Sequence, residues 1–97
     1  MKDLEEIKKI LTAHKKELEE KYQVKSIGIF GSVARGEQKK TSDVDILVDF
    51  HEVPDLLEFV AMERRLEEIL GIKVDLMRKQ VIRHELQDRI LSEVVEA

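Results

Sequence analysis

An acidic strand restricts the fold of this chain more than any other segment. Residues 43–50, DVDILVDF, alternate between two faces, with Val44, Ile46 and Val48 on one face and Asp43, Asp45, Leu47 and Asp49 on the other. Alternation of this kind predicts a strand whose apolar face is buried. On the opposite face, the side chains of Asp43 and Asp45 emerge roughly 6–7 Å apart along the backbone. Carboxylates at that spacing repel each other, so they indicate either charges that protect a solvated strand edge or a binding site for a positive group.

The segments around this strand predict a small α+β domain. The expected order is a helix over residues 3–22, a strand over 24–30, a helical turn and loop over 32–42, the acidic strand, a helix from Pro54–Asp55 to Leu70, a strand over 72–77 and a helix over roughly 80–95. The apolar stripe of the second long helix consists of Leu56, Phe59, Val60, Leu66 and Ile69, and Gly71 ends that helix. We therefore expect the α+β class, with a small mixed β-sheet of about three strands packed against helices in a single domain over residues 1–97.

Composition excludes several classes of function. The formal net charge is -4, which argues against direct binding of duplex nucleic acid. The chain has no cysteine, so disulfides and thiolate metal sites are excluded. No apolar run approaches the roughly 18 residues that a membrane span needs, and the acidic start MKDLEEIKKI is unlike a signal peptide. We expect a cytoplasmic protein that makes no membrane contact.

A third carboxylate, Asp75, lies inside the apolar strand predicted over residues 72–77. If that strand is a neighbour of the acidic strand, Asp43, Asp45 and Asp75 form one cluster. Mg²⁺ prefers oxygen ligands and commonly links carboxylates to substrate phosphates, and a three-carboxylate cluster can hold two metal ions for displacement at phosphorus. Asp49 is two residues beyond Asp45, near the strand end, and we expect it to have a structural or solvated role.

A candidate anion site begins where the strand over residues 24–30 ends. Gly31 and Ser32 follow that strand, and a serine that caps a helical turn leaves backbone N–H groups free for a phosphate. Arg35 follows within one turn and can reach the same phosphate. Taken alone, a Gly-Ser pair is more typical of an ordinary strand-to-helix turn, and the sequence contains neither a P-loop nor a Rossmann motif. Lys39 and Lys40, in the loop that follows, are expected to be solvated.

The combination of these motifs is more specific than its parts. Gly31-Ser32 is followed after ten residues by Asp43-x-Asp45, and Asp75 lies on a later strand. This spacing resembles the signature of the DNA polymerase β-type nucleotidyltransferase superfamily. The whole chain is similar to the minimal nucleotidyltransferases of that superfamily, because GSVARGE and SDVDILVDF match their motif and KVDLM stands where their third carboxylate is expected. The resemblance implies a polymerase-β-like nucleotidyltransferase core.

The resemblance also implies a reaction and a partner. Asp43 and Asp45 would hold Mg²⁺, as two ions, with Asp75 as a further ligand and the general base. Ser32 and the backbone after Gly31 would bind the phosphates of ATP. Minimal nucleotidyltransferases of this kind resemble antitoxins that transfer AMP from ATP to a tyrosine of a HEPN toxin, which is therefore the expected partner. Two alternatives remain: nucleotidyl transfer to a small molecule with the help of a partner subunit, and inhibition of the toxin by binding without chemistry.

Overall fold

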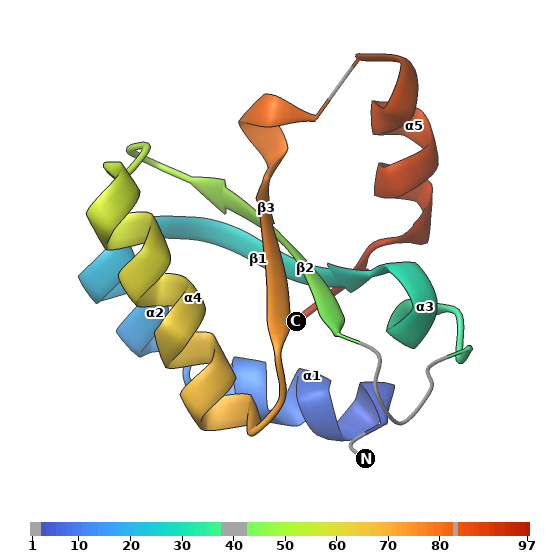
Figure 1. Cartoon of the computed structure of the whole chain (residues 1–97), viewed down its shortest axis with the longest axis horizontal. Coiled ribbons are helices and arrows are strands. Elements are labelled where there is room, and N and C mark those ends of the chain that lie inside the picture. The colour runs from blue at the N-terminus through green and yellow to red at the C-terminus, as the bar shows by residue number, and fades with distance from the viewer. Residues whose placement is uncertain (1–2, 38–42, 83) are drawn as a thin grey trace.

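A computed structural model describes residues 3–37, 43–82 and 84–97 and has the α+β class that the sequence predicts (Figure 1). Its helices are α1 (Leu4–Ala13), α2 (Lys15–Tyr22), α3 (Gly31–Ala34), α4 (Leu56–Leu70) and α5 (His84–Glu93), with a 3₁₀ turn η1 (Lys79–Val81) before α5. Its strands are β1 (Val24–Phe30), β2 (Val44–Phe50), β3 (Val74–Arg78) and β4 (Val95–Glu96).

The sheet is mixed and has four strands in the order β3-β2-β1-β4. β1 is antiparallel to β2 and to β4, whereas β2 and β3 are parallel. The expected number of about three strands was one too few. β4 comprises two residues, and a strand that short has no alternation that could be recognised in the sequence.

The fourth strand fits against the sheet because Gly28 of β1 has no side chain. A Cβ atom added to Gly28 would collide with the side chain of Val94 and would lie 3.1 Å from the carbonyl oxygen of Val95. Just beyond β4, the N–H of Ala97 donates to the carbonyl oxygen of Ile27 at 3.0 Å. The C-terminal segment therefore lies directly beside the strand that leads into Gly31.

One predicted helix is divided in the structure, and another is shorter than predicted. The helix expected over residues 3–22 is broken at His14, whose backbone leaves helical geometry with φ -103° and ψ 5°. The imidazole Nδ1 of His14 lies 2.9 Å from the carbonyl oxygen of Ile10, in the preceding turn, and such an insertion bends a helix. The helix expected over roughly 80–95 was too long, because the chain leaves α5 after Glu93 to pair with β1.

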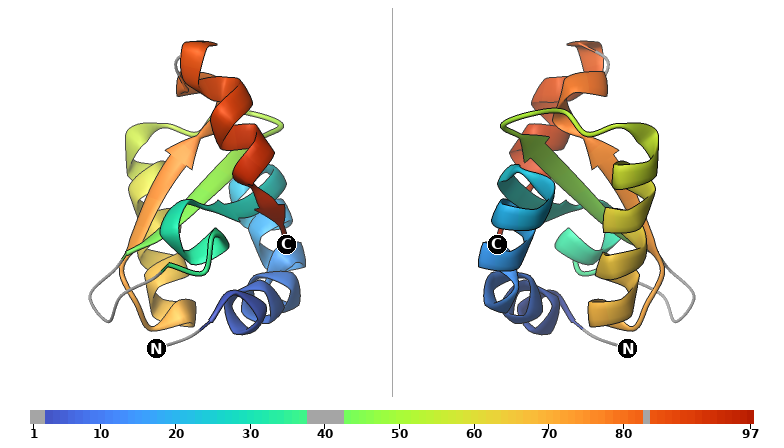
Figure 2. Two further views of the ribbon diagram at one scale, coloured as in Figure 1. Left: turned by 90° about the vertical axis from the view of Figure 1, so that its right-hand side faces the viewer. Right: turned by 90° about the vertical axis from the view of Figure 1, so that its left-hand side faces the viewer.

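The hydrophobic core lies between the sheet and the helices α1, α2 and α4, and α3 contributes Val33 to it, while α5 lies toward the other side of the sheet (Figures 1 and 2). The strand alternation predicted for β2 is confirmed, since Val44, Ile46 and Val48 are fully buried. Fully buried side chains of the helices join them: Ile7, Leu11, Leu18, Val33, Met62, Leu66 and Leu70. The apolar stripes of the helices and the apolar face of the acidic strand thus form one core.

The boundaries of α4 agree with the sequence, but one end of its predicted stripe does not. Asp55 caps the helix by accepting a hydrogen bond from the N–H of Glu58 at 2.8 Å, and Gly71 ends it at a positive φ of 70°. Leu66 is buried as predicted, whereas Leu56 is 75% exposed. At the helical period, Leu56 points about 80° away from Leu66, so the first turn of α4 does not share the direction of the buried stripe.

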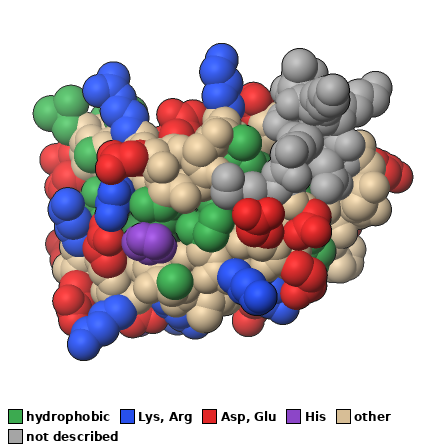
Figure 3. Space-filling model, turned by 90° about the horizontal axis from the view of Figure 1, so that it is seen from below, with side chains coloured by type: hydrophobic (Ala, Val, Ile, Leu, Met, Phe, Trp, Pro, Cys, Tyr) green, Lys and Arg blue, Asp and Glu red, His purple; other side chains and the backbone are tan. Residues whose placement is uncertain are grey.

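Charged side chains dominate the surface. Figure 3 shows both signs spread over the face of the molecule that includes α1, around a small apolar strip, as expected for a chain in which 39% of residues are charged. An ion pair links α2 to α4. Nε and Nη2 of Arg65 donate to the two carboxylate oxygens of Glu17 at 2.9 and 3.1 Å. These hydrogen bonds from Arg65 lower the pKa of the Glu17 carboxyl. In the described ranges, no helix combines the length and the apolar content that crossing a membrane requires.

Candidate active site

Asp45 and Asp75 lie side by side on the sheet. Asp45 of β2 is the direct partner of Asp75 in the parallel pairing of β2 with β3, and of Phe30 in the antiparallel pairing with β1. Side chains in register on neighbouring strands point to the same face, about 5 Å apart at the backbone. This face is opposite to the one that Val44 and Ile46 bury in the core. The expectation that the strand of Asp75 is a neighbour of the acidic strand is confirmed.

The electrostatic environment of Asp45 is unfavourable for a free carboxylate. Burial raises the pKa of Asp45, and the negative charges of Asp75 and Asp43 and a hydrogen bond with Asp75 raise it further. The positive charge of Arg35 acts in the opposite direction. A group of like charges that are partly removed from water is stabilised by a cation. The sheet face around Asp45 therefore favours a positively charged ligand.

Gly31 closes one side of this site. It is the first residue of α3 and has a positive φ of 73°. A Cβ atom on Gly31 would collide with the Asp45 carboxylate and would lie 2.9 Å from its carbon Cγ. The sequence indicates Gly31 as part of an anion-binding turn, but the contact with Asp45 could not be read from the sequence because the two residues belong to different elements. The backbone of the Gly31 turn therefore lies directly against the Asp45 carboxylate.

Ser32 does not cap α3, contrary to the expectation from the sequence. The N-cap residue is Phe30, which makes no side-chain capping hydrogen bond, and Ser32 is the second residue of the helix. The reason is that the helical hydrogen bonding already includes Gly31, whose carbonyl oxygen accepts from the N–H of Arg35 at 3.1 Å, so Ser32 lies inside the first turn. The side chain of Ser32 is half-buried beside the site. Its predicted contact with a phosphate remains a prediction.

Arg35 is held by two carboxylates. Its Nε donates to Glu37 at 3.0 Å, and its Nη1 donates to Glu93 of α5 at 3.1 Å. These two glutamates raise the pKa of Arg35, so its positive charge is retained. Lys39 and Lys40, which follow in the sequence, lie outside the described residues.

Comparison with known proteins identifies the family. The sequence matches the family described as nucleotidyltransferase domain over residues 11–97, which is nearly the whole chain. The chain belongs to this nucleotidyltransferase family. The resemblance that rests on Gly31-Ser32 and Asp43-x-Asp45 is therefore confirmed at the level of the family.

Individual relatives agree with this nucleotidyltransferase assignment. The chain is 55% identical over 95 residues to the protein adenylyltransferase MntA of Thermococcus cleftensis, covering 98% of this chain and 96% of the relative. A solved structure of a minimal nucleotidyltransferase has a TM-score of 0.76 at 31% identity, covering 97% of this chain and 95% of its own. A chain in the complex of the tri-AMPylated Shewanella oneidensis HEPN toxin with an MNT antitoxin has a TM-score of 0.68 at 19% identity, covering 93% and 70%, and shows the same fold.

The carboxylates of this nucleotidyltransferase suit Mg²⁺. Mg²⁺ is commonly held by one or two carboxylates, while water and substrate phosphates supply its remaining ligands. Asp45 and Asp75 provide such a pair, and Asp43 precedes Asp45 by two residues. Within residues 3–37, 43–82 and 84–97, no three side chains of the metal-binding types are grouped closely enough to form a metal site by themselves. The three-carboxylate metal site therefore remains a prediction.

Asp49 has the structural role that the sequence suggests. Its Oδ1 accepts a hydrogen bond from Nε2 of Gln80 at 2.7 Å, and it pairs with Ser26 across the sheet. This hydrogen bond connects β2 to η1, which follows β3. Asp49 lies on the same sheet face as Asp45, but its carboxylate makes a contact between β2 and η1.

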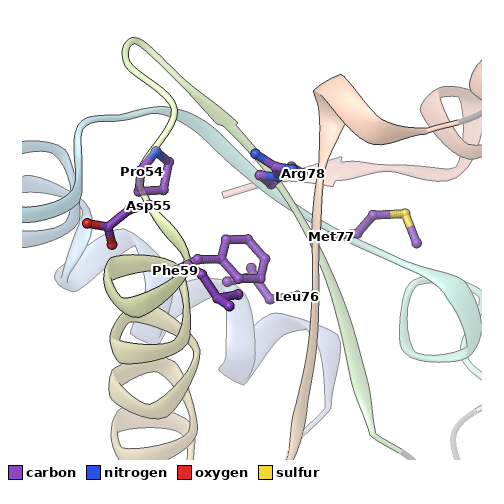
Figure 4. A pocket seen from close by; sticks show the side chains of 7 residues that line it. Pro54, Asp55, Phe59, Leu76, Met77 and Arg78 are labelled. Carbon is purple, nitrogen blue, oxygen red and sulfur yellow. The ribbon is translucent and has the colours of Figure 1, made fainter.

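An apolar pocket lies elsewhere in the nucleotidyltransferase. Its volume is about 450 Å³, and it is lined by Pro54, Asp55, Leu56, Phe59, Leu76, Met77 and Arg78. Figure 4 shows Phe59 and Leu76 converging between α4 and β3, with Met77 pointing away from them. Leu76 points to the sheet face opposite to Asp75, so this pocket contains none of the carboxylates of the candidate site.

Proposed function

We propose that this nucleotidyltransferase transfers AMP from ATP to the hydroxyl group of a tyrosine on a HEPN toxin, and that it acts as the antitoxin of that toxin. The name of the Thermococcus relative, which is similar over nearly its whole length, supports protein adenylylation. The Shewanella complex supports a HEPN toxin as the partner and AMP as the transferred group, through a protein of the same fold. We expect the reaction in the cytoplasm, where ATP and Mg²⁺ are available.

One observation carries this proposal: the carboxylates of Asp45 and Asp75 are in register on adjacent parallel strands, beside the Gly31 turn. The carboxylates suit a cation that accompanies the triphosphate, and the turn leaves room beside Asp45 only because Gly31 has no side chain. A triphosphate placed there would have its charged groups next to the metal ligands. This arrangement suits phosphoryl chemistry, in which positioning and electrostatic stabilisation account for most of the catalysis.

The proposed roles are those that the family resemblance implies, and the adjacent positions of Asp45 and Asp75 support them. Asp43 and Asp45 hold Mg²⁺, as two ions, together with Asp75. When bound, Mg²⁺ supplies electrostatic stabilisation for the negative charge that develops around the α-phosphorus. Asp75 accepts the proton of the tyrosine hydroxyl, whose oxygen forms a bond with the α-phosphorus while the bond to the pyrophosphate oxygen breaks. The backbone after Gly31 and the hydroxyl of Ser32 bind the β- and γ-phosphates.

A labelling experiment tests the proposal. The chain is incubated with ATP labelled at the α-phosphate, Mg²⁺ and a purified HEPN-type protein as the proposed partner, and label is followed into protein and located by mass spectrometry. We expect one or more AMP groups on tyrosine of the partner and none with the double variant Asp43→Ala/Asp45→Ala. Transfer that survives in this variant would contradict the metal-site assignment.

The same experiment separates the rival functions. Neutralisation of the toxin by wild-type protein without any label transfer would favour inhibition by binding alone. Label that appears only on a small molecule from a cell extract, in the presence of a partner subunit, would favour a small-molecule acceptor. Either result would overturn protein adenylylation as the function of this chain.

A further inference from the structure

Arg35 connects the candidate active site to the C-terminal helix. Its guanidinium donates from Nε to Glu37 and from Nη1 to Glu93, at 3.0 and 3.1 Å, and Glu93 lies 58 residues later in the chain. These two ion pairs use two of the five N–H groups that a guanidinium carries, so the side chain can still donate to a further anion. Arg35 also follows Gly31 by one helical turn, and its charge acts on Asp45. Arg35 is therefore near enough to the candidate site for its charge to act there.

The position of Glu93 is fixed by more than its ion pair. Glu93 is the last residue of α5, and two residues later β4 pairs with β1 at Ile29 and Gly28. The close approach of Val94 to Gly28 and the hydrogen bond of the Ala97 N–H anchor the same segment. The side chain of Glu93 is 26% exposed, whereas that of Glu37, which neighbours Arg35 in sequence, is 65% exposed. Glu93 is thus the better fixed of the two carboxylates.

We propose that Glu93 is a positioning residue for nucleotide binding, which holds the guanidinium of Arg35 in place to contact a phosphate bound at the Gly31 turn. The proposal rests on the proposed function, because it requires that a nucleoside triphosphate binds beside Asp45. Arginine loses substantial side-chain entropy when it is fixed by a ligand, and a side chain that is already held in one orientation loses less on binding. Glu93 supplies this orientation from an element outside the GSVARGE motif.

Equilibrium binding of a non-hydrolysable ATP analogue in the presence of Mg²⁺ tests the proposal by calorimetry. We expect Glu93→Gln to weaken binding by about two- to five-fold, the range that a partly exposed ion pair can supply. The matched control is Glu85→Gln, the same substitution at an exposed position of the same helix, and it is expected to leave the affinity unchanged. Glu93→Asp, which keeps the charge, is expected to restore part of the affinity.

A double-mutant cycle determines whether Glu93 acts through Arg35. We expect Arg35→Gln alone to weaken binding, and the addition of Glu93→Gln to this variant to cause no further loss. Unchanged or tighter binding in Glu93→Gln would overturn the proposal, since tighter binding means that Glu93 competes with the phosphate for Arg35. An equal loss in the presence and absence of Arg35 would also overturn it, because it indicates a general effect on the fold.

The outcome for wild-type protein separates this inference from the proposed function. A wild-type chain that binds the analogue, together with a Glu93→Gln variant that binds it equally well, contradicts only the role of Glu93. A wild-type chain that binds no nucleotide would contradict both proposals. A kinetic measurement gives a second readout: in the labelling reaction, Glu93→Gln should raise KM for ATP and leave kcat within about two-fold, as expected for a residue that acts on binding.

Discussion

Asp45→Asn is expected to reduce AMP transfer by about a thousandfold or more. Asp45 is the carboxylate that lies between Asp75 and Gly31, and asparagine keeps its shape but loses the charge that holds a cation. The lost metal interaction contributes several kcal/mol of transition-state stabilisation, which corresponds to at least about a thousandfold in rate. The rate of label transfer to the partner protein, under saturating ATP and Mg²⁺, measures this effect.

The same substitution is not expected to destabilise the fold. Burial and the charges of Asp75 and Asp43 oppose the ionised form of Asp45, so removal of its charge relieves repulsion. We expect the Tm of Asp45→Asn, without nucleotide and metal, to equal or exceed that of the wild type. Asp49→Asn is the control on the same strand face: its hydrogen bond from Gln80 can persist, and transfer should stay near the wild-type rate. A large loss of transfer in Asp49→Asn, or a large loss of stability in Asp45→Asn, would contradict these assignments.

Gly31→Ala is expected to impair both stability and transfer. Gly31 and Gly36 have the same φ of 73°, so alanine at either position adopts a strained backbone, at a cost of about 1 kcal/mol. The new methyl group at Gly31 meets the Asp45 carboxylate, whereas no atom of the described residues lies within 4 Å of a Cβ atom at Gly36. The collision adds about 1–3 kcal/mol and displaces the carboxylate.

Gly36→Ala is therefore the matched control for Gly31→Ala. Urea unfolding is expected to show a loss of about 2–4 kcal/mol for Gly31→Ala and about 1 kcal/mol for Gly36→Ala. Transfer should fall by about a hundredfold or more in Gly31→Ala only, because a displacement of about 1 Å at a catalytic group has effects of this size. Similar behaviour of the two variants would show that the contact between Gly31 and Asp45 has no functional role.

Local patterns account for the features that the sequence predicted correctly. The alternation of residues 43–50 identifies both the buried and the acidic face of β2, and Asp55 and Gly71 mark the ends of α4 by their capping preferences. Asp75 is conspicuous because a carboxylate inside an apolar strand is unusual, and the pairing of its strand with β2 is confirmed, while its role stays a prediction. Each of these signals depends on residues that are close together in the sequence.

Most features that the sequence missed depend on contacts between residues that are far apart in the sequence. β4 exists because Gly28 accepts the C-terminal segment, and the ion pair of Arg35 with Glu93 joins residues 58 positions apart. The break at His14 is a local exception, because it depends on a contact between the His14 side chain and the backbone four residues earlier, which the apolar stripe of that helix does not reveal. The contact of Gly31 with Asp45 requires the pairing register of β1 with β2. A single sequence carries no direct signal for such contacts.

The parallel pairing of β2 with β3 makes the active site sensitive to the length of one short connection. Three residues, 71–73, join the end of α4 to β3, and two hydrogen bonds fix the register there: Val44 N–H to the carbonyl oxygen of Lys73 at 2.9 Å, and Val74 N–H to Oε2 of Glu67 at 3.1 Å. One residue inserted or deleted in this connection would shift β3 by one position and turn Asp75 into the core. We therefore expect related chains that keep this chemistry to have no insertion or deletion at residues 71–73. None of these three residues is a predicted ligand or catalytic group.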